Sequence, residues 1–286
     1  MNIIVGASGQ VGSILLKELV SRELPVRAVV RDPGKVLVQN LEIEKADLFH
    51  EEQVVAAFKG GTTAFLLTPE NPGSDDVLED TRKIIRNYKV AIKATEITKV
   101  VALSCIGAHI NGNTGNVLMS QMLEQELEEM DIERVYIRPS YYFSNWLAYL
   151  DTIRQYGIMP TFFPEDLKIE MLSPVDLARF IADEITRERH AVSKRIQELT
   201  GPQRYSSREV ASVFSEILNK PVNVQPIPPE NWLETLYGAG FSDNAAKNLA
   251  AMTKAVIDHK LVPQKPKERI QLSTPFAQYL EKQLKK

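Results

Sequence analysis

The sequence contains very little cysteine, because Cys105 is the only one among its 286 residues. A single cysteine excludes an intramolecular disulfide framework and a cysteine-rich zinc site, and it fits a reducing, cytoplasmic setting. Long apolar runs are also absent, and none approaches the roughly 20 residues of a membrane-spanning helix. Residues 1–6 lack a basic stretch and lead directly into glycines, so we expect neither a signal peptide nor a membrane partner.

The sequence also lacks a strong excess of positive or negative charge. The net charge is −3, with 25% charged and 44% apolar residues, which is ordinary for a soluble globular protein. This balance provides no electrostatic reason to expect direct binding of nucleic acid. The four histidines are scattered without metal-ligand spacing, so we expect no metal site.

Short apolar strands alternate with amphipathic helices in the first half of the chain. The expected strands are residues 2–6, 26–31, 41–48, 62–68, 100–104 and 134–137. The expected helices are residues 10–22, 51–59, 75–95 and 117–130. Mainly apolar strands with intervening helices predict an α/β fold, in which a doubly wound parallel sheet is covered on both faces.

The regular pattern ends after Pro139, where prolines and aromatic residues become frequent. Ser173 is expected to cap a helix that has Pro174 at its first position and Asp176 in its first turn. Further expected elements are strands at 197–200 and 222–227, a helix from the cap Ser207 to about 218, and helices at 232–237, 243–259 and 275–285. We therefore expect a core over residues 1–139. Residues 140–286 are expected to form mainly a smaller C-terminal α/β lobe, with some segments returning to the core.

A glycine-rich turn joins the first expected strand to the first expected helix. Its sequence is Gly6-Ala7-Ser8-Gly9-Gln10-Val11-Gly12. Gly6 allows a sharp turn, Gly9 allows close approach of a pyrophosphate, and Gly12 allows the helix to pack against the sheet. Free N–H groups at the helix start then face the anion, and the Ser8 hydroxyl can add a hydrogen bond. A purely structural turn is the alternative, but the strand–turn–helix context favours dinucleotide binding.

The end of the second expected strand indicates which dinucleotide is bound. NAD-specific sites usually place an acidic residue there for the ribose 2′-hydroxyl. Here Arg31 follows the strand, and its cation suits the 2′-phosphate of NADP(H). Asp32 precedes a proline and is expected to shape the turn. We favour NADP(H) over NAD(H), and a solvated strand-end charge is the alternative interpretation of Arg31.

A series of short motifs resembles, in its order along the whole chain, the NmrA-like family of atypical short-chain dehydrogenase/reductases. After the glycine turn the motifs are Val30-Arg31-Asp32-Pro33, Ala46-Asp47-Leu48, Phe65-Leu66-Leu67-Thr68-Pro69, Ile137-Arg138-Pro139, Ser173-Pro174-Val175-Asp176-Leu177-Ala178, Leu199-Thr200-Gly201-Pro202 and Thr274-Pro275-Phe276. The resemblance implies an NADP(H)-binding Rossmann core and a small substrate lobe.

The resemblance also implies positions along the cofactor. It places Asp47 and Leu48 beside the adenine, although from the residues alone Asp47 is equally well a strand-terminating residue. The other residues that it places along the dinucleotide are Leu67, Thr68, Ser104 and Cys105, with Pro139 to Tyr142 near the nicotinamide. The predicted cofactor-binding set is Gly6, Ser8, Gly9, Gln10, Val11, Gly12, Arg31, Asp47, Leu48, Leu67, Thr68, Ser104 and Pro139.

The acid–base pair of fully equipped short-chain dehydrogenases is missing. These enzymes use a tyrosine and, four residues later, a lysine, where the lysine lowers the tyrosine pKa and the tyrosine moves a proton. Val117 and Gln121 stand at the corresponding positions, and residues 110–130 contain neither tyrosine nor lysine. The usual carbonyl–alcohol chemistry is therefore unsupported. Hydride transfer to a quinone or dye needs mainly a bound nicotinamide and a well-placed acceptor.

Gln121, Tyr141 and Tyr142 are the candidates for a catalytic role. Gln121 can hydrogen-bond a ribose hydroxyl or a substrate carbonyl, but it cannot act as an acid or base. The two tyrosines follow the sixth expected strand at the carboxyl edge, where ligands bind in such folds. Together with Phe143 and Trp146 they form either a substrate wall or, more commonly for such clusters, the core of the lobe. Cys105 is interpreted as a strand-end residue rather than a nucleophile.

Two functions are compatible with these observations. The first is an NADPH-dependent reductase of a quinone-like or other conjugated small-molecule acceptor. The second is a redox sensor that binds NADP(H) without turnover and transmits its state to a protein partner. A sugar-nucleotide epimerase is a third and weaker hypothesis, because such enzymes normally need the missing pair.

Overall fold

The computed structural model describes residues 1–188 and 191–285, and it is built on an eight-stranded sheet whose strands all run parallel. The strands are β1 (Asn2–Val5), β2 (Val26–Val30), β3 (Glu42–Lys45), β4 (Thr63–Leu67), β5 (Lys99–Leu103), β6 (Glu133–Pro139), β10 (Ser193–Thr200) and β13 (Ile270–Gln271). Their spatial order is β13-β10-β6-β5-β4-β1-β2-β3. The order reverses between β1 and β4, and doubly wound sheets bind ligands in the crevice at such a point.

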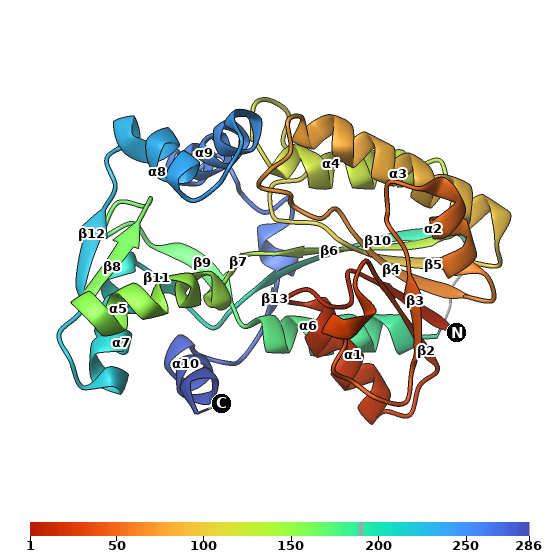
Figure 1. The fold of residues 1–286 in the computed structure, drawn as a ribbon, viewed down its shortest axis with the longest axis horizontal. Helices are drawn as coiled ribbons and strands as arrows, with labels where there is room; N and C mark the ends of the chain where they lie inside the picture. Colours follow the sequence, from red (N-terminus) through yellow and green to blue (C-terminus); the bar gives the residue numbers. More distant parts are fainter. Residues whose placement is uncertain (189–190, 286) are drawn as a thin grey trace.

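Helices cover both faces of this sheet (Figure 1). One face carries α1 (Gly12–Ser21) and α6 (Pro174–Thr186), and the other carries α2 (Glu51–Phe58), α3 (Val77–Ala94) and α4 (Val117–Leu127). Successive side chains of a strand point to opposite faces. Accordingly Ile3 and Val5 pack under α2 and α3, whereas Ile4 packs with the apolar side of α1. The predicted doubly wound α/β fold is confirmed.

A smaller lobe lies beyond the carboxyl edge of the sheet (Figure 1). Its strands are β7 (Tyr141–Tyr142), β9 (Ile169–Leu172) and β11 (Arg204–Tyr205) in one small sheet, and β8 (Ile158–Thr161) with β12 (Asn223–Pro226) in another. Its helices are α5 (Leu150–Tyr156), α7 (Ser207–Leu218), α8 (Trp232–Gly238), α9 (Asp243–Ile257) and α10 (Phe276–Leu284). Phe143, Trp146, Phe214 and Phe276 are almost fully buried and form the centre of its core.

Segments from the second half of the chain join the lobe to the core. The helix α6 packs beside α1, and β10 pairs with β6 along its whole length. Ser173 caps α6 as predicted, with its hydroxyl accepting from the N–H groups of Val175 and Asp176. The Asp176 carboxylate accepts from the backbone N–H and the hydroxyl of Thr274, at 3.0 and 2.8 Å. Two of the family motifs therefore meet in space and fasten the last segment of the chain to the core.

Two sequence predictions were wrong in detail. The cap of α7 is Ser206 rather than Ser207, because Ser206 and Glu209 form a reciprocal capping box. Strand β10 begins at Ser193 rather than at residue 197. Its first part carries Lys194 and Arg195, whose charges pair with carboxylates of the neighbouring elements, and apolar patterning alone does not detect such a strand. None of the helices in residues 1–188 and 191–285 has both the length and the apolar character needed to cross a bilayer.

Candidate active site

The glycine turn adopts a compact conformation that side chains would disrupt. Gly6 has φ +66°, and a Cβ there would lie 2.8 Å from the Leu67 side chain. A Cβ on Gly12 would collide with the carbonyl oxygen of Gly6, and that same oxygen accepts a hydrogen bond of 2.9 Å from the Gly9 N–H. Glycine is therefore required at Gly6 and Gly12 so that α1 starts directly against the end of β1.

The start of α1 presents unused hydrogen-bond donors at the crevice between β1 and β4. The first helical bonds run from Ser13 to Gly9 and from Leu15 to Val11. Among the described residues, the backbone N–H groups of Gln10, Val11 and Gly12 have no protein acceptor. Such donors at the positive end of a helix dipole suit a phosphate group. The Gln10 side chain turns instead to Ser144 of the lobe, to whose hydroxyl it donates.

Arg31 and Asp32 occupy different environments at the end of β2. The Asp32 carboxylate accepts from the Gly34 N–H at 3.0 Å, which is the turn-shaping role predicted for it. Arg31 is exposed, and in the part of the chain that the structure describes it forms no ion pair. A free guanidinium at this strand end can reach a 2′-phosphate, and it can equally remain a solvated charge.

Asp47 and Leu48 follow β3 and are held in a local turn. The Asp47 carboxylate accepts from the Phe49 N–H at 3.0 Å, and the Leu48 carbonyl accepts from the Asn87 amide at 2.7 Å. Asp47 therefore ends the strand region, which is one of the two roles considered for it. The contact of Asp47 with adenine remains a prediction.

Leu67 and Thr68 lead from β4 into a loop that contributes a residue missed by the sequence interpretation. The Leu67 carbonyl accepts from the Tyr88 hydroxyl at 2.9 Å, and Thr68 is half-buried. Two residues further on, the Glu70 carboxylate accepts from the Asn116 amide at 3.3 Å. Burial raises the pKa of the Glu70 carboxyl. No motif distinguishes Glu70 in the sequence, and its position depends on a contact 46 residues away in the chain.

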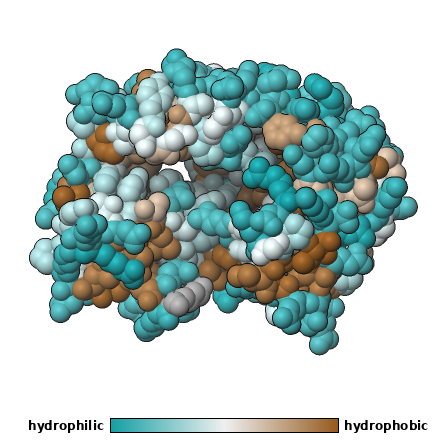
Figure 2. All heavy atoms as spheres, in the orientation of Figure 1, coloured by the Kyte–Doolittle hydropathy of each residue, from teal (hydrophilic) through white to brown (hydrophobic). Residues whose placement is uncertain are grey.

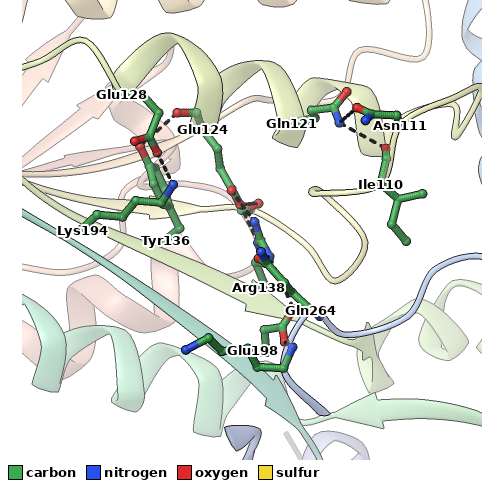
Figure 3. A network of polar contacts seen from close by, with 12 residues as sticks. Ile110, Asn111, Gln121, Glu124, Glu128, Tyr136, Arg138, Lys194, Glu198 and Gln264 are labelled. Atoms are coloured by element: carbon green, nitrogen blue, oxygen red, sulfur yellow. Dashed lines mark hydrogen bonds and ion pairs between the residues drawn. The ribbon is translucent and has the colours of Figure 1, made fainter.

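Ser104 belongs to a buried polar network, of which Figure 3 shows Glu124, Arg138, Glu198 and Gln264. Its hydroxyl donates to Glu124 at 2.5 Å, and Glu124 receives two hydrogen bonds from Arg138, at 2.8 and 2.6 Å. Arg138 also donates to Gln264 at 2.8 Å and lies 3.5 Å from Glu198. Burial opposes the charge of Arg138, but its hydrogen bonds and attraction to the two carboxylates outweigh this and raise its pKa. The network thus orients Ser104 and joins the core to the segment before β13.

Cys105 and His109 lie in the loop after β5. Burial raises the pKa of the Cys105 thiol to about 11, against a smaller opposing effect of a hydrogen bond with Ser120. The thiol therefore stays protonated near neutral pH, which argues against a nucleophilic role. Burial and the nearby Arg138 charge lower the pKa of His109, so its imidazole is favoured in the neutral form.

Gln121 faces the loop that precedes its own helix (Figure 3). Its amide nitrogen donates to the Ile110 carbonyl at 3.1 Å and lies 3.4 Å from the Asn111 side-chain oxygen. Val117, at the first position of α4, is almost fully buried. The helix therefore carries no acid–base pair at these positions, and the Gln121 amide group stabilises the loop.

Pro139, Tyr141 and Tyr142 continue from β6 into the lobe. Pro139 is the last residue of β6. The Tyr141 ring packs edge-on against Trp146 and Phe163, with centroids 5.9 and 5.6 Å apart, so it belongs largely to the core of the lobe.

Tyr142 lies on the cleft side, electrostatically coupled to Cys105 and Glu70, and burial raises the pKa of its phenol. Only Tyr142 of the aromatic cluster is thus associated with the site, whereas Phe143 and Trp146 are core.

Several buried polar atoms at this edge of the sheet have no partner. In the described part of the chain they include His109 Nδ1, Thr114 Oγ1, Asn116 Oδ1 and Ser140 Oγ. All four belong to two segments, the β5–α4 loop and the junction of β6 with β7. Buried polar atoms are usually hydrogen-bonded, and exceptions concentrate at sites that receive a ligand or water. These atoms and the free donors of the glycine turn therefore fit a polar ligand such as a dinucleotide.

Helices α8 and α9 cover the cleft. The Ser242 N–H donates to the Pro72 carbonyl at 2.8 Å, and the Val77 N–H donates to the Asn244 side chain at 3.0 Å. A Cβ on Gly115 would collide with the Asn248 carbonyl, so α9 rests directly on the backbone of the β5–α4 loop. Figure 2 shows the surface hollowed beneath α9, between the two halves of the molecule. Within residues 1–188 and 191–285, no cluster of side chains is suited to a metal ion.

Comparison with known proteins finds one matching family, relatives named as reductases, and solved structures that include a nucleoside-diphosphate-sugar epimerase. The model of the NmrA-like family matches residues 2–282. The chain is 26% identical to an NAD(P)H azoreductase from Xenophilus azovorans over 254 residues, which cover 86% of this chain and 84% of that protein.

Two solved structures extend this comparison. The NADPH-dependent quinone oxidoreductase from Escherichia coli complexed with NADPH has a TM-score of 0.79 at 22% identity, with 99% of this chain and 100% of that one covered. The triphenylmethane reductase from Citrobacter sp. complexed with NADP(H) has a TM-score of 0.77 at 20% identity, with 99% of each chain covered. At these identities the likeness shows a shared fold.

Proposed function

Since the chain belongs to the NmrA-like family, we propose that it is an NADPH-dependent reductase that transfers hydride directly to a quinone-like or other conjugated acceptor. The observation that carries the proposal is the start of α1, where backbone N–H groups without a protein acceptor lie at the point where the strand order reverses between β1 and β4. Relatives named for the reduction of azo compounds, quinones and triphenylmethane dyes support the acceptor class, because all of these are conjugated molecules.

The residues of the site divide between binding and orientation. The glycine turn would hold the pyrophosphate, and the bound nicotinamide would supply the hydride. Ser104, oriented by Glu124, would position the adjacent ribose. Helices α8 and α9 cover the cleft and would limit the access of water to it. A conjugated acceptor does not need a tyrosine–lysine pair to polarise it.

The proposal predicts NADPH oxidation in the presence of a suitable acceptor. Purified protein is incubated with NADPH and a panel of quinones, azo dyes, triphenylmethane dyes and enones, and the loss of NADPH absorbance is followed. We expect turnover with at least one acceptor class. Tight NADPH binding without turnover on the whole panel would contradict the reductase.

A second measurement tests the redox sensor, the alternative function with which the missing acid–base pair is compatible. A sensor requires clearly different affinities for NADP⁺ and NADPH, which calorimetry measures directly. If turnover is absent and the two affinities differ at least tenfold, about 1.4 kcal/mol, the sensor becomes the better description.

We further propose that Arg31 sets the preference for NADP(H). Replacement of Arg31 with alanine is expected to weaken NADPH binding roughly tenfold, the effect of losing one charge-assisted hydrogen bond, and to leave NADH binding unchanged. The dissociation constants of both cofactors are measured for wild type, Arg31→Ala and Arg31→Lys. The lysine variant keeps the charge and should retain most of the preference. Equal losses for NADPH and NADH would show that Arg31 does not contact the 2′-phosphate.

A further inference from the structure

Glu70 carries a carboxyl group close to the candidate cofactor site. It lies in the β4–α3 loop, three residues beyond the end of β4 and next to the point where the strand order reverses. The Asn116 amide donates to its carboxylate at 3.3 Å, which links this loop to the start of α4. The other amide atom, Asn116 Oδ1, is buried without a partner in the described structure. Burial raises the pKa of the Glu70 carboxyl, and the bond from Asn116 lowers it by a smaller effect.

Two properties of Glu70 together indicate that it lies on a concave part of the protein surface. More than a third of its surface is accessible, yet the surrounding protein is dense enough to raise the pKa of the carboxyl. A side chain on a convex surface would be accessible without this effect. Tyr142 combines partial exposure with a raised pKa in the same way, and it is electrostatically coupled to Glu70. The two side chains therefore lie near each other at the carboxyl edge of the sheet.

The charged groups around Glu70 do not neutralise its carboxylate. The groups coupled to it are the neutral thiol of Cys105 and the neutral phenol of Tyr142. On its own loop and α3, Asp76 caps the helix and Asp80 accepts from Ser74.

On α9, which packs on this loop, Asp243 pairs with Lys247. Among the described residues, no Lys or Arg forms an ion pair with Glu70. Burial in this environment therefore raises the pKa of the Glu70 carboxyl above its ordinary value.

We propose that Glu70 is the proton donor to the acceptor, positioned by Asn116. This inference rests on the proposed reductase function. In the step, the C4–H bond of the dihydronicotinamide breaks and its electron pair moves with the hydrogen to the acceptor. The O–H bond of Glu70 breaks, and the proton goes to the acceptor oxygen or nitrogen that gains negative charge. The acceptor is reduced by two electrons, NADPH becomes NADP⁺, and water returns a proton to Glu70.

The other titratable groups in the cleft are less suited to this role. The Cys105 thiol, with a pKa of about 11, and the Tyr142 phenol, whose pKa is raised by burial, release protons poorly near neutral pH. Burial raises the pKa of the Cys105 thiol and outweighs the charge of Arg138, which lowers it, and the lysine of the usual pair is absent. A carboxylic acid with a raised pKa is closer to the operating pH, where general acid catalysis is most effective.

Replacement of Glu70 with glutamine tests the proposal. The rate of a single turnover of NADPH oxidation with a saturating quinone is measured from mildly acidic to mildly alkaline pH. In wild type the rate should fall as the pH rises through the Glu70 pKa, since only the protonated form donates. In Glu70→Gln it should be roughly a hundredfold lower on the acidic side, in the range expected for loss of a general acid, and independent of pH in that window. The dissociation constant for NADPH should not change.

The matched control is Glu79→Gln. Glu79 is an exposed residue in the first turn of α3 that pairs only with Arg82 among the described residues, and its replacement should leave the rate and the pH profile unchanged. A wild-type rate and pH profile in Glu70→Gln would overturn the role of Glu70 while leaving the reductase intact. Absence of turnover in the wild-type protein would instead overturn the reductase itself, so the two failures are distinguishable.

Discussion

Replacing Gly9 with aspartate is expected to weaken NADPH binding about a thousandfold. The new carboxylate would stand where the backbone approaches the pyrophosphate, and two unit charges about 4 Å apart repel by roughly 4 kcal/mol in partly solvated protein. That energy corresponds to about a thousandfold in affinity. A Cβ at Gly9 lies 3.1 Å from the Gly6 carbonyl oxygen, so the turn has to adjust only slightly. Fluorescence titration with NADPH gives the dissociation constant.

The control for this substitution is Gly238→Asp. A Cβ at Gly238 meets no heavy atom within 4 Å, and the residue ends α8, on the lobe. It introduces the same charge away from the glycine turn, so NADPH binding should be unchanged. If both variants bind NADPH equally well and both remain folded, the phosphates do not lie at the start of α1, and the proposed cofactor site is wrong.

Replacing Arg138 with methionine is expected to lower the free energy of unfolding by about 3–5 kcal/mol, the usual cost of removing one partner of a buried ion pair. Arg138 is 2% exposed, and its loss leaves the buried Glu124 carboxylate without its cation (Figure 3). The Glu198 carboxylate loses the same cation but keeps hydrogen bonds from two backbone N–H groups. Chemical denaturation measures the loss. The loss should shrink as the pH is lowered, because stranded carboxylates have raised pKa values in the folded state and protonation neutralises them.

The control for this stability change is Arg208→Met. Arg208 pairs with Asp166 and Glu165, but its side chain is 57% exposed, and exposed pairs contribute at most about 1 kcal/mol. If Arg138→Met costs no more than Arg208→Met, the buried network does not stabilise the junction of core and lobe. Addition of Glu124→Gln to Arg138→Met should recover part of the loss, because one stranded charge is then removed.

Local patterns were sufficient for the framework of the cofactor site. Gly6 and Gly12 were identified from spacing alone, because Gly6 needs a positive φ in the turn itself and a Cβ on Gly12 would collide with Gly6, six positions earlier. The cap of α6 by Ser173 and the turn formed by Asp32 are equally local, since each involves hydrogen bonds to residues two or three positions away. Ser207 was mistaken for the cap of α7 because Ser206 and Ser207 are adjacent, and only the reciprocal bond with Glu209 distinguishes them.

The acid–base groups of the cleft could not be predicted from local sequence patterns. Glu70 resembles any other loop glutamate in the sequence, and its chemistry depends on Asn116, Cys105 and Tyr142, which come from two other segments. Gln121 was singled out by its place in a motif, yet its amide group contacts Ile110 and Asn111. A motif indicates where a residue lies along a helix, but it does not show which neighbours take up its hydrogen bonds.

By itself, the sequence determined the doubly wound fold, the position of the glycine turn, the family to which the chain belongs and the absence of the tyrosine–lysine pair. These features depend on periodicity and on contacts between near neighbours, which the order of residues encodes directly. Only the tertiary structure decided which carboxylates pair with Arg138, which polar atoms of the described residues remain without partners, and that Glu70 lies beside Asn116. Burial and charge pairing arise from segments far apart in the chain, so they become defined only when the fold brings those segments together.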